Sequence, residues 1–429
     1  MCSKPTSWYA SHKPDHAAVI GGMPQSRFCF GVFQMLRWVV MILGALPLLA
    51  CGPAPAPQAA PEAAPPPAPI QVRVASYNAS LYDNDAGGLI ARLERGDEAA
   101  RNIAAVIQHQ RPDVLLLNEF DHDPDLRAAE LFQRRYLEIP QAGQVPIRYD
   151  YRFSAPVNTG EPSGMDLDGD GRSDGPNDAF GYGTHPGQYG MLVLSRYPID
   201  TAAVRSFQHL LWKDLPDARR PMNPDGTPYY SDAIWERLRL SSKSHWDVPI
   251  RTALGTLHLL ASHPTPPVFD GPEDRNGARN ADEIALWTHY LDSPDAAWLC
   301  DDAGRCGGLP AAAHFVLAGD LNADPDDGDA AEGAIAALLT HPRVAADFVP
   351  RSQGAVETAK RHGIERHGDV ASHTGDFGPR TGTMRLDYVL PSRSLTVRDG
   401  GVFWPQQGER GADWCAASDH RMVWLDLGL

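Results

Sequence analysis

The stretch PDVLLLNE at residues 112–119 is a continuous apolar run that ends in a carboxylate. A run of this kind predicts a strand that is covered on both faces. Upstream, VRVASYN at residues 72–78 alternates in period two and predicts a half-buried strand. Between them, residues 93–110 place apolar side chains at helical spacing. The folded region therefore opens with a strand, a helix and a second strand.

Short apolar runs bounded by Gly, Pro, Asp or His recur along the rest of the chain and predict further strands at 190–195, 255–262, 314–318, 385–390 and 422–427. Helices are expected around residues 282–291 and 330–339. Strands interrupted by a few helices favour layered α/β or α+β packing around stacked sheets. No internal repeat at a fixed period is visible.

The composition fits one large domain preceded by a leader. Of the 429 residues, 43% are hydrophobic and 8% aromatic, which is ordinary for a chain that buries a core. The formal net charge of −16 argues against tight, sequence-independent binding to long nucleic acid, which needs clustered Lys and Arg. It does not exclude a nuclease, because acidic residues at a metal site contribute to that balance.

The first part of the chain has the pattern of an export signal. Residues 35–50, MLRWVVMILGALPLLA, combine an Arg, a short apolar run and small residues, and the run is shorter than the roughly 20 residues of a membrane span. Residues 1–34 are interpreted as an over-extended gene start. LLAC at residues 48–51 resembles a bacterial lipoprotein box, which makes Cys51 the expected lipid-attachment site. An uncleaved anchor or a plain secretory peptide is the alternative.

Residues 52–70 are rich in Pro and Ala and predict an extended spacer, so the folded domain is expected at 71–429. We expect a protein of the cell envelope, lipid-anchored and facing the periplasm or on the outer membrane, or alternatively a secreted one. Cys300 and Cys306 flank a short polar loop and predict a disulfide in an oxidising compartment, with free thiols as the alternative. A zinc site is not expected, because no His or Cys pair flanks them at ligand spacing.

Most of the predicted strands end in a residue that is able to bind a metal or move a proton: Asn78, Glu119, His263, Asp320 with Asn322, Asp387, and Asp419 with His420. Each is ambiguous alone, since Asn78 is also a turn former and Glu119 also a helix-capping or solvated carboxylate. Their joint occurrence at strand ends favours one site at a sheet edge, where loops are held by a rigid scaffold.

The ordered set SYN at 76–78, PDVLLLNE at 112–119, SH at 262–263, GDLN at 319–322, RLDYVL at 385–390 and SDH at 418–420 resembles the endonuclease/exonuclease/phosphatase superfamily. Its members include pancreatic deoxyribonuclease, neutral sphingomyelinases and inositol-polyphosphate 5-phosphatases. The resemblance covers residues 72–427, with long insertions at 121–189 and 205–250. It implies an α+β fold, a four-layer α/β/β/α sandwich with two packed mixed β-sheets flanked by helices.

The resemblance also implies a metal centre. Glu119 is similar to the principal metal ligand of the family, with Asn78 beside it and Asp419 near the same ion. Mg²⁺ or Mn²⁺ is the expected cation, since hard cations favour carboxylate and carbonyl oxygens.

The remaining motif residues are implied to be catalytic. His420 is similar to the group that contacts the scissile phosphate or activates water, and Asp387 to the carboxylate that orients it. Asp320 and Asn322 would position the nucleophile and the phosphate oxygens, and His263 is similar to a second histidine that assists the leaving group. A carboxylate that fixes the tautomer of its imidazole partner is chemically sensible in this role.

A second cation is expected within the first insertion. Asp166, Asp168, Asp170 and Asp174 alternate around glycines and resemble a calcium loop, although the Glu at position twelve of a full EF-hand is missing. The expected role is a structural Ca²⁺ that orders a lid. The alternative is a solvated acidic loop.

Two further groups of residues are candidates for a role at the site. Arg279, Asn280 and Glu283 lie at the start of a helix just beyond His263 and are either a capped, solvated helix end or a phosphate-facing or His-orienting group. The same superfamily includes exonuclease III-type repair enzymes, which usually have a tyrosine-bearing loop before the GDxN motif. Tyr182 and Tyr189 are candidates for that tyrosine.

The sequence thus predicts a monomeric, metal-dependent phosphoester hydrolase at the cell envelope, held to the membrane through its lipid anchor. Its substrate is left open among nucleic acid, nucleotides, phospholipid head groups and sugar phosphates, because fold alone does not choose a chemistry. The competing hypothesis is a catalytically inactive, calcium-binding surface module for adhesion or scaffolding.

Overall fold

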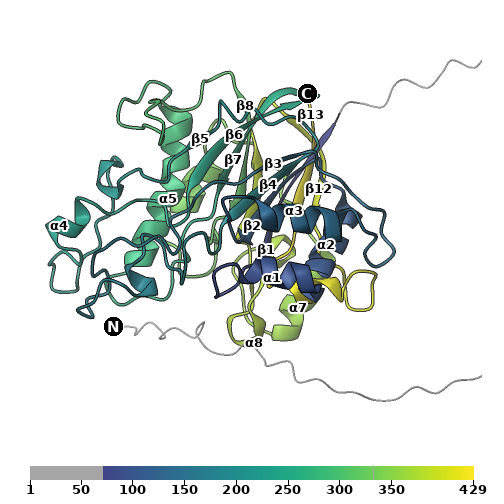
Figure 1. Cartoon of the computed structure of the whole chain (residues 1–429), viewed down its shortest axis with the longest axis horizontal. Coiled ribbons are helices and arrows are strands. Elements are labelled where there is room, and N and C mark those ends of the chain that lie inside the picture. Colours follow the sequence, from purple (N-terminus) through teal and green to yellow (C-terminus); the bar gives the residue numbers. More distant parts are fainter. Residues whose placement is uncertain (1–70, 332) are drawn as a thin grey trace, which may run out of the picture. The chain divides into compact units, whose positions relative to one another are not determined.

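The computed structural model describes residues 71–331 and 333–429. Two β-sheets form the centre of this region (Figure 1). The six-stranded sheet has the order β12-β13-β1-β2-β4-β3; its strands are β1 (Val72–Leu81), β2 (Val114–Phe120), β3 (Tyr151–Phe153), β4 (Met191–Ser195), β12 (Thr396–Val402) and β13 (Val423–Gly428). The five-stranded sheet has the order β11-β8-β7-β6-β5; its strands are β5 (Arg205–Ser206), β6 (His245–Thr252), β7 (Gly255–Ser262), β8 (His314–Asp320) and β11 (Asp387–Pro391).

Both sheets are mixed. In the first, β1 pairs with β2 in parallel and with β13 antiparallel. In the second, β8 pairs with β7 in parallel and with β11 antiparallel. A small hairpin of β9 (Gly375–Asp376) and β10 (Thr383–Met384) lies outside the two sheets. The helices are α1 (Gly88–Arg95), α2 (Glu98–Gln110), α3 (Arg127–Phe132), α4 (Asp232–Trp235), α5 (Arg275–Asp292), α6 (Ala334–Leu339), α7 (Gln353–His362) and α8 (Gly378–Thr381).

The apolar run of β2 shows why the sheets are covered on both faces. Successive side chains of a strand point to opposite faces, so Leu116 packs in the core between the two sheets while Leu115 and Leu117 pack against the helices. In β8, Val316 likewise faces the inter-sheet core and Leu317 the outer one. Each run therefore contributes to two cores at once.

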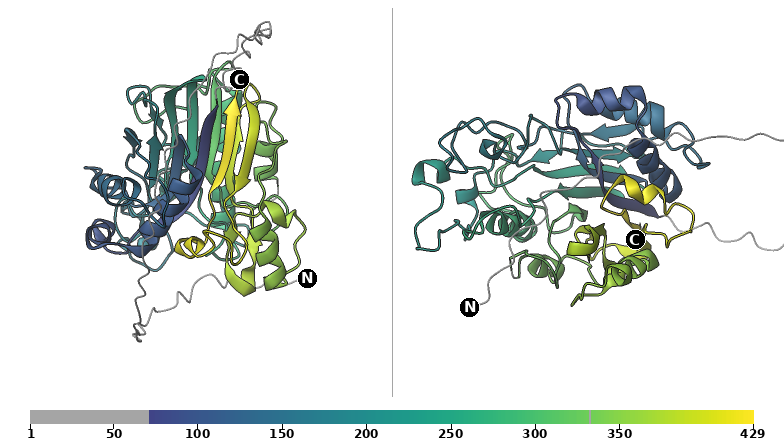
Figure 2. Two further views of the ribbon diagram at one scale, coloured as in Figure 1. Left: turned by 90° about the vertical axis from the view of Figure 1, so that its right-hand side faces the viewer. Right: turned by 90° about the horizontal axis from the view of Figure 1, so that it is seen from below.

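Helices cover the two outer faces. Ile103 and Ile107 of α2 pack in the core on the outer face of the six-stranded sheet. Ile284 and Trp287 of α5 pack in the core on the outer face of the five-stranded sheet. Figure 1 shows α1, α2 and α3 on the side of β1 and β2, and α5 beside β6 and β7; Figure 2 shows the same layers from two other sides. The four-layer α/β/β/α sandwich expected from the sequence is confirmed.

Some elements differ from the expectation. The single helix predicted over 93–110 is two helices, because Gly96 has φ 93° and Asp97 then caps α2 by accepting a hydrogen bond from the Ala100 amide at 2.7 Å. The interpretation of residues 205–250 as an insertion left out β6, although Trp246, Val248 and Ile250 alternate in period two along it and pack in the inter-sheet core. β3 lies within residues 121–189, and β5 with most of β6 lies within residues 205–250, so these two stretches contribute strands to the sheets.

The structure joins Cys300 and Cys306 in a disulfide, while Cys415 is free and buried. Among the helices of the described region, none is both long and apolar enough to cross a membrane. The leader, Cys51 and the spacer 52–70 lie outside the described residues.

Candidate active site

The topology brings the predicted site residues to one edge of both sheets. β1, β2, β7 and β8 end at this edge, whereas β11 and β13 begin there because each is antiparallel to its neighbour. Asp387 is consequently paired in register with Asp320. The two sheets are joined here by Asn118, whose side-chain oxygen accepts a hydrogen bond from the Asp320 amide at 3.2 Å.

Gly319 explains the first letter of the GDLN motif. A Cβ at this position would lie 2.0 Å from the Ser262 carbonyl oxygen. Only glycine allows so close a backbone approach. The end of β8 therefore lies against the end of β7, and this contact places Asp320 beside His263.

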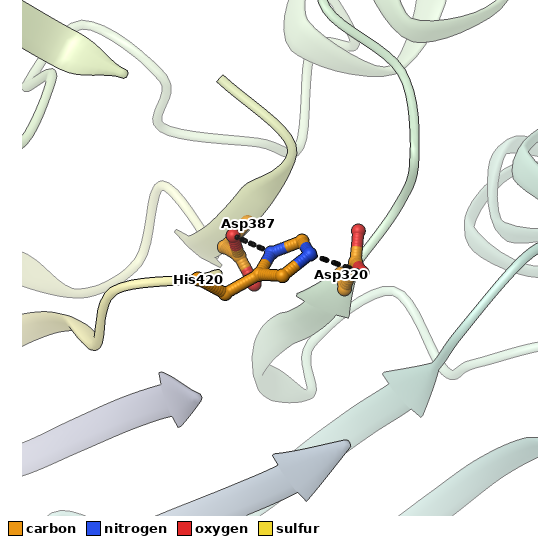
Figure 3. Close-up of side chains that lie close together, drawn as sticks. All are labelled: Asp320, Asp387 and His420. Carbon is orange, nitrogen blue, oxygen red and sulfur yellow. Dashed lines mark hydrogen bonds and ion pairs between the residues drawn. The ribbon is translucent and has the colours of Figure 1, made fainter. Parts of the chain in front are cut away.

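His420 lies between two carboxylates (Figure 3). Its Nδ1 donates to Asp387 Oδ2 over 2.8 Å, since an ionised carboxylate only accepts. Its Nε2 faces Asp320 Oδ2 at 3.6 Å. Burial lowers the pKa of His420, but Asp387 and Asp320 outweigh it and hold that pKa well above its ordinary value. The imidazole is therefore a buried cation with its Nε2–H directed toward the site.

Asn78 connects the remaining acidic groups. Its side-chain nitrogen donates to Glu119 Oε1 at 3.1 Å and to Asp320 Oδ2 at 3.0 Å. Ser80 Oγ donates to Asp419 Oδ1 at 3.3 Å, from the same strand. Strand β1 thereby places its own side chains against three carboxylates.

The residues present fit a divalent cation at Glu119. Burial raises the pKa of Glu119 to about 7, and the carboxylate of Asp419 adds to the shift. Across residues 71–331 and 333–429, neither Glu119 nor Asp419 forms an ion pair with Lys or Arg. Glu119 and Asp419 supply carboxylate oxygens of the kind that Mg²⁺ and Mn²⁺ prefer, and the side-chain nitrogen of Asn78 holds Glu119 in place.

A different trio, Asp320, Asp387 and His420, also has ligand atoms within 4.8 Å of one another. We interpret it as a proton-transfer and orienting group, because His420 Nδ1 is already bound by Asp387. Burial raises the pKa of Asp320 to about 6, although His420 and Asn78 partly oppose the shift.

His263 is the second histidine of the site. Its Nε2 lies 3.4 Å from Asp320 Oδ2. Its Nδ1 is buried and has no hydrogen-bond partner in the part of the chain that the structure describes. Burial, followed by the charges of Lys243 and His420, holds the pKa of His263 well below its ordinary value. His263 is therefore neutral and His420 charged, although both face the same carboxylate.

Asn322 and Glu119 adopt backbone conformations that are rare for their residue types. Asn322 has φ 51° and Glu119 has φ 54°. Such left-handed residues carry a cost of about 1–3 kcal/mol and concentrate at functional sites. The Asn322 amide donates to Asp320 Oδ1 at 3.0 Å and its side-chain nitrogen to the Pro264 carbonyl, so Asn322 orients Asp320.

The helix-start group has another role than the two expected. Arg279 donates to the carbonyl oxygens of Leu240 and Phe180 at 2.8 and 2.6 Å, so it holds loops together and is neither solvated nor directed at phosphate. Asn280 binds the Leu321 carbonyl at 3.0 Å. Glu283 accepts hydrogen bonds from the main chain around Ser242.

The acidic loop closes around a different set of carboxylates from the one expected. Asp166 and Asp168 have ligand atoms within 4.8 Å of Asp178, a residue that the sequence did not single out. Asp174 pairs with Arg172 at 3.1 Å, and Asp170 accepts from the Arg172 amide. Asp178 thus joins Asp166 and Asp168 in this group, which does not include Asp170 and Asp174, and Ca²⁺ binding stays a prediction.

The two candidate tyrosines differ in burial. Tyr189 packs on Tyr82 with ring centroids 4.4 Å apart, and its pKa is raised by burial and further by Tyr82 and Glu119. Tyr182 is an exposed side chain.

Sequence reasoning missed Lys243. It is buried, and its charge acts on Glu283, Glu119 and Asp320. A single lysine in the stretch SSKSH carries no motif, so nothing in the sequence pointed to it. A further cluster of Asp324, Asp327 and His373 was also not anticipated.

Comparison with known proteins identifies a family. The model of the Endonuclease/Exonuclease/phosphatase family matches residues 75–420. This range contains every predicted metal and catalytic residue from Asn78 to His420. No curated protein matches the chain.

Several solved structures are similar to this one. An endonuclease/exonuclease/phosphatase from Beutenbergia cavernae is 19% identical, with a TM-score of 0.47 over 84% of this chain and 72% of that one. Sphingomyelinase C from Streptomyces griseocarneus is 18% identical, with a TM-score of 0.40 over 83% and 99%. A mannosyl-6-phosphatase from Bacteroides thetaiotaomicron is 14% identical, with a TM-score of 0.41 over 83% and 100%.

Proposed function

The chain belongs to the endonuclease/exonuclease/phosphatase family, and on this premise we propose that it hydrolyses phosphoester bonds with a bound divalent cation. One observation carries the proposal: a charged His420 lies between Asp387 and Asp320, beside the carboxylates of Glu119 and Asp419. A surface module for adhesion would not need a buried imidazolium and this concentration of uncompensated carboxylates.

Glu119, Asn78 and Asp419 would hold Mg²⁺ or Mn²⁺. When bound, the cation stabilises negative charge on the phosphoryl and leaving oxygens. His420 contributes a further positive charge: its Nε2–H lies 3.6 Å from Asp320 Oδ2 and would donate to a phosphoryl oxygen bound there. Asp387 keeps the ring protonated and oriented.

Asp320 is the group placed to accept a proton. Its pKa of about 6 leaves it ionised at neutral pH, and Asn78 and Asn322 orient its two oxygens. A water oxygen forms the bond to phosphorus while its proton passes to Asp320, and the bond from phosphorus to the leaving oxygen breaks. The neutral His263, 3.4 Å from Asp320, orients the same carboxylate.

The substrate class stays at the level of phosphoesters: nucleic acid, nucleotides, phospholipid head groups or sugar phosphates. The net charge of −16 favours small or membrane-bound esters over long DNA, since a non-specific DNA contact needs clustered cations.

The deciding experiment is hydrolysis of bis(p-nitrophenyl) phosphate with Mg²⁺ or Mn²⁺, with and without EDTA. We expect turnover that EDTA abolishes and that added cation restores. DNA, sphingomyelin and nucleotides assayed in parallel would rank the substrates. A folded protein without activity on any of them would favour the inactive calcium-binding module.

We further propose that the enzyme is exported and anchored through a lipid on Cys51, and that Ca²⁺ orders the acidic loop. Support for export comes from the signal-like residues 35–50 and from Cys300 and Cys306, which form a disulfide suited to an oxidising compartment. Support for Ca²⁺ comes from the grouping of Asp166, Asp168 and Asp178.

A further inference from the structure

Lys243 lies just before β6 and is 6% exposed. Lysine is almost never buried to this degree unless it is paired. Yet in the described residues its ammonium group forms no hydrogen bond and no ion pair. Lys213, by contrast, pairs with Glu236 on the surface. Because this ammonium group is not fully enclosed, its N–H donors are open to water or to a ligand that enters the site, and a largely buried charge gains from such a partner.

The surroundings of Lys243 place it beside His263. In the β6–β7 pairing, His245 lies opposite Ser262, and the hydroxyl oxygen of Ser242, the neighbour of Lys243, lies 3.4 Å from the His263 carbonyl oxygen. The charge of Lys243 also acts on Glu119 and Asp320. The residue therefore belongs to the wall of the site that is formed by β6 and β7.

Glu283 is the carboxylate whose charge acts most strongly on Lys243, but both of its oxygens already accept hydrogen bonds from other groups. Its Oε1 accepts from the amide and the hydroxyl of Ser242 at 2.6 and 3.0 Å, and its Oε2 accepts from the Thr265 amide at 2.7 Å. Glu283 thus balances the charge of Lys243 from a distance without taking its N–H donors. These donors stay available to a ligand.

We propose that Lys243 is a phosphate-binding residue, whose ammonium group contacts a non-bridging phosphoryl oxygen of the substrate on the His263 side of the site. The inference rests on the proposed function and adds a residue to it. In a site of low dielectric, a fixed ammonium contributes most where negative charge grows on the phosphoryl oxygens. Lys243 then faces the phosphoryl group from the side of the five-stranded sheet, whereas Glu119, which would hold the cation, belongs to the six-stranded sheet.

The test compares the wild type with Lys243→Met, Lys243→Gln and Lys243→Arg, with Lys213→Met as the matched surface control. Binding of inorganic phosphate in the presence of Mg²⁺ is measured by calorimetry. Loss of one charge-assisted contact should weaken phosphate binding by about tenfold or more in the Met and Gln variants. The Arg variant should recover most of the affinity, and the control should match the wild type.

A structural role makes different predictions. If Lys243 only balances Glu283, the Met and Gln variants lose thermal stability and keep their affinity for phosphate, and the proposal is overturned. The proposal is also overturned if a folded Lys243→Met or Lys243→Gln variant binds phosphate as tightly as the wild type. It is overturned as well if the wild type does not bind phosphate. If Lys243→Met does not fold, Lys243→Gln decides, since it keeps a polar side chain of similar length.

Kinetics separate this inference from the proposed function. For bis(p-nitrophenyl) phosphate we expect the Met variant to show a lower kcat together with a raised KM. A wild type that binds phosphate through Lys243 but hydrolyses no ester would contradict the proposed function alone. Wild-type kcat and KM in Lys243→Met, alongside an active wild type, would contradict the role of Lys243 alone.

Discussion

Replacing Asp387 with Asn tests the central geometry of the site. The carboxylate is buried, lies 2.8 Å from His420 Nδ1, and contributes to the raised pKa of that imidazole. Asn has almost the same shape but no charge. The substitution therefore leaves the packing in place and removes the interaction that keeps His420 oriented and protonated.

The expected magnitude follows from two effects. A hydrogen bond to a buried charge contributes about 1.5–3 kcal/mol, which corresponds to about ten- to hundredfold in rate. The Asn amide also presents either a donor or a neutral acceptor to Nδ1, so the productive tautomer and charge of His420 are no longer enforced. Together these effects predict a fall in kcat of about 10²–10⁴, with a small change in KM.

The assay is steady-state hydrolysis of bis(p-nitrophenyl) phosphate at saturating Mn²⁺, with circular dichroism and thermal melting to show that the variant is folded. Asp292→Asn is the matched control, because it breaks a His–Asp contact of 2.9 Å, between Asp292 and His341, at the end of α5. The control should keep wild-type kcat. A folded Asp387→Asn variant with kcat within about threefold of the wild type would refute the reasoning, since the contact would then contribute little to the barrier.

Four further predictions follow from individual residues. Glu119→Gln should lower turnover by about two or more decades without lowering Tm, because burial and Asp419 already disfavour its charge in the metal-free protein; unchanged turnover in the purified variant would remove Glu119 from the mechanism. Added Ca²⁺ should raise Tm by binding only the folded loop, and Asp178→Asn should abolish this rise while Asp174→Asn keeps it; a Tm that does not respond to Ca²⁺ would dismiss the loop as a site. Burial lowers the pKa of His245 from 6.5 to about 4, so the unfolded state binds the proton first and up to about 3 kcal/mol of stability, present above pH 6.5, is lost as the pH falls toward 4; urea unfolding at several pH values should show a weaker acid dependence in His245→Gln, and an identical dependence would assign the effect to other groups. Cys51→Ala should abolish labelling of the expressed full chain by a clickable fatty acid, and equal labelling of the variant would place the lipid elsewhere.

The four layers of the fold were predictable because local patterns encode them. The apolar run of β2 needs cover on both faces, and Leu115 and Leu116 indeed pack in two different cores. Asn78, Glu119 and Asp320 were expected at one sheet edge because each follows or ends a predicted strand. Strands that run in the same direction end at the same edge of a sheet. β6 was not predicted because most of it falls within residues 205–250, which the family resemblance marks as an insertion, although Trp246, Val248 and Ile250 alternate in period two.

By itself the sequence determined the kinds of side chain at the site, their order along the chain and the alternation that buries both sheets. Only the tertiary structure decided which partners they meet: Asp320 faces two histidines of opposite protonation, Asp178 joins the acidic loop, and Arg279 binds main-chain carbonyls. Lys243 is the clearest case, because the stretch SSKSH gives no sign that this lysine is buried. Burial and partnership arise from segments far apart in the chain, so no local spacing of residues specifies them.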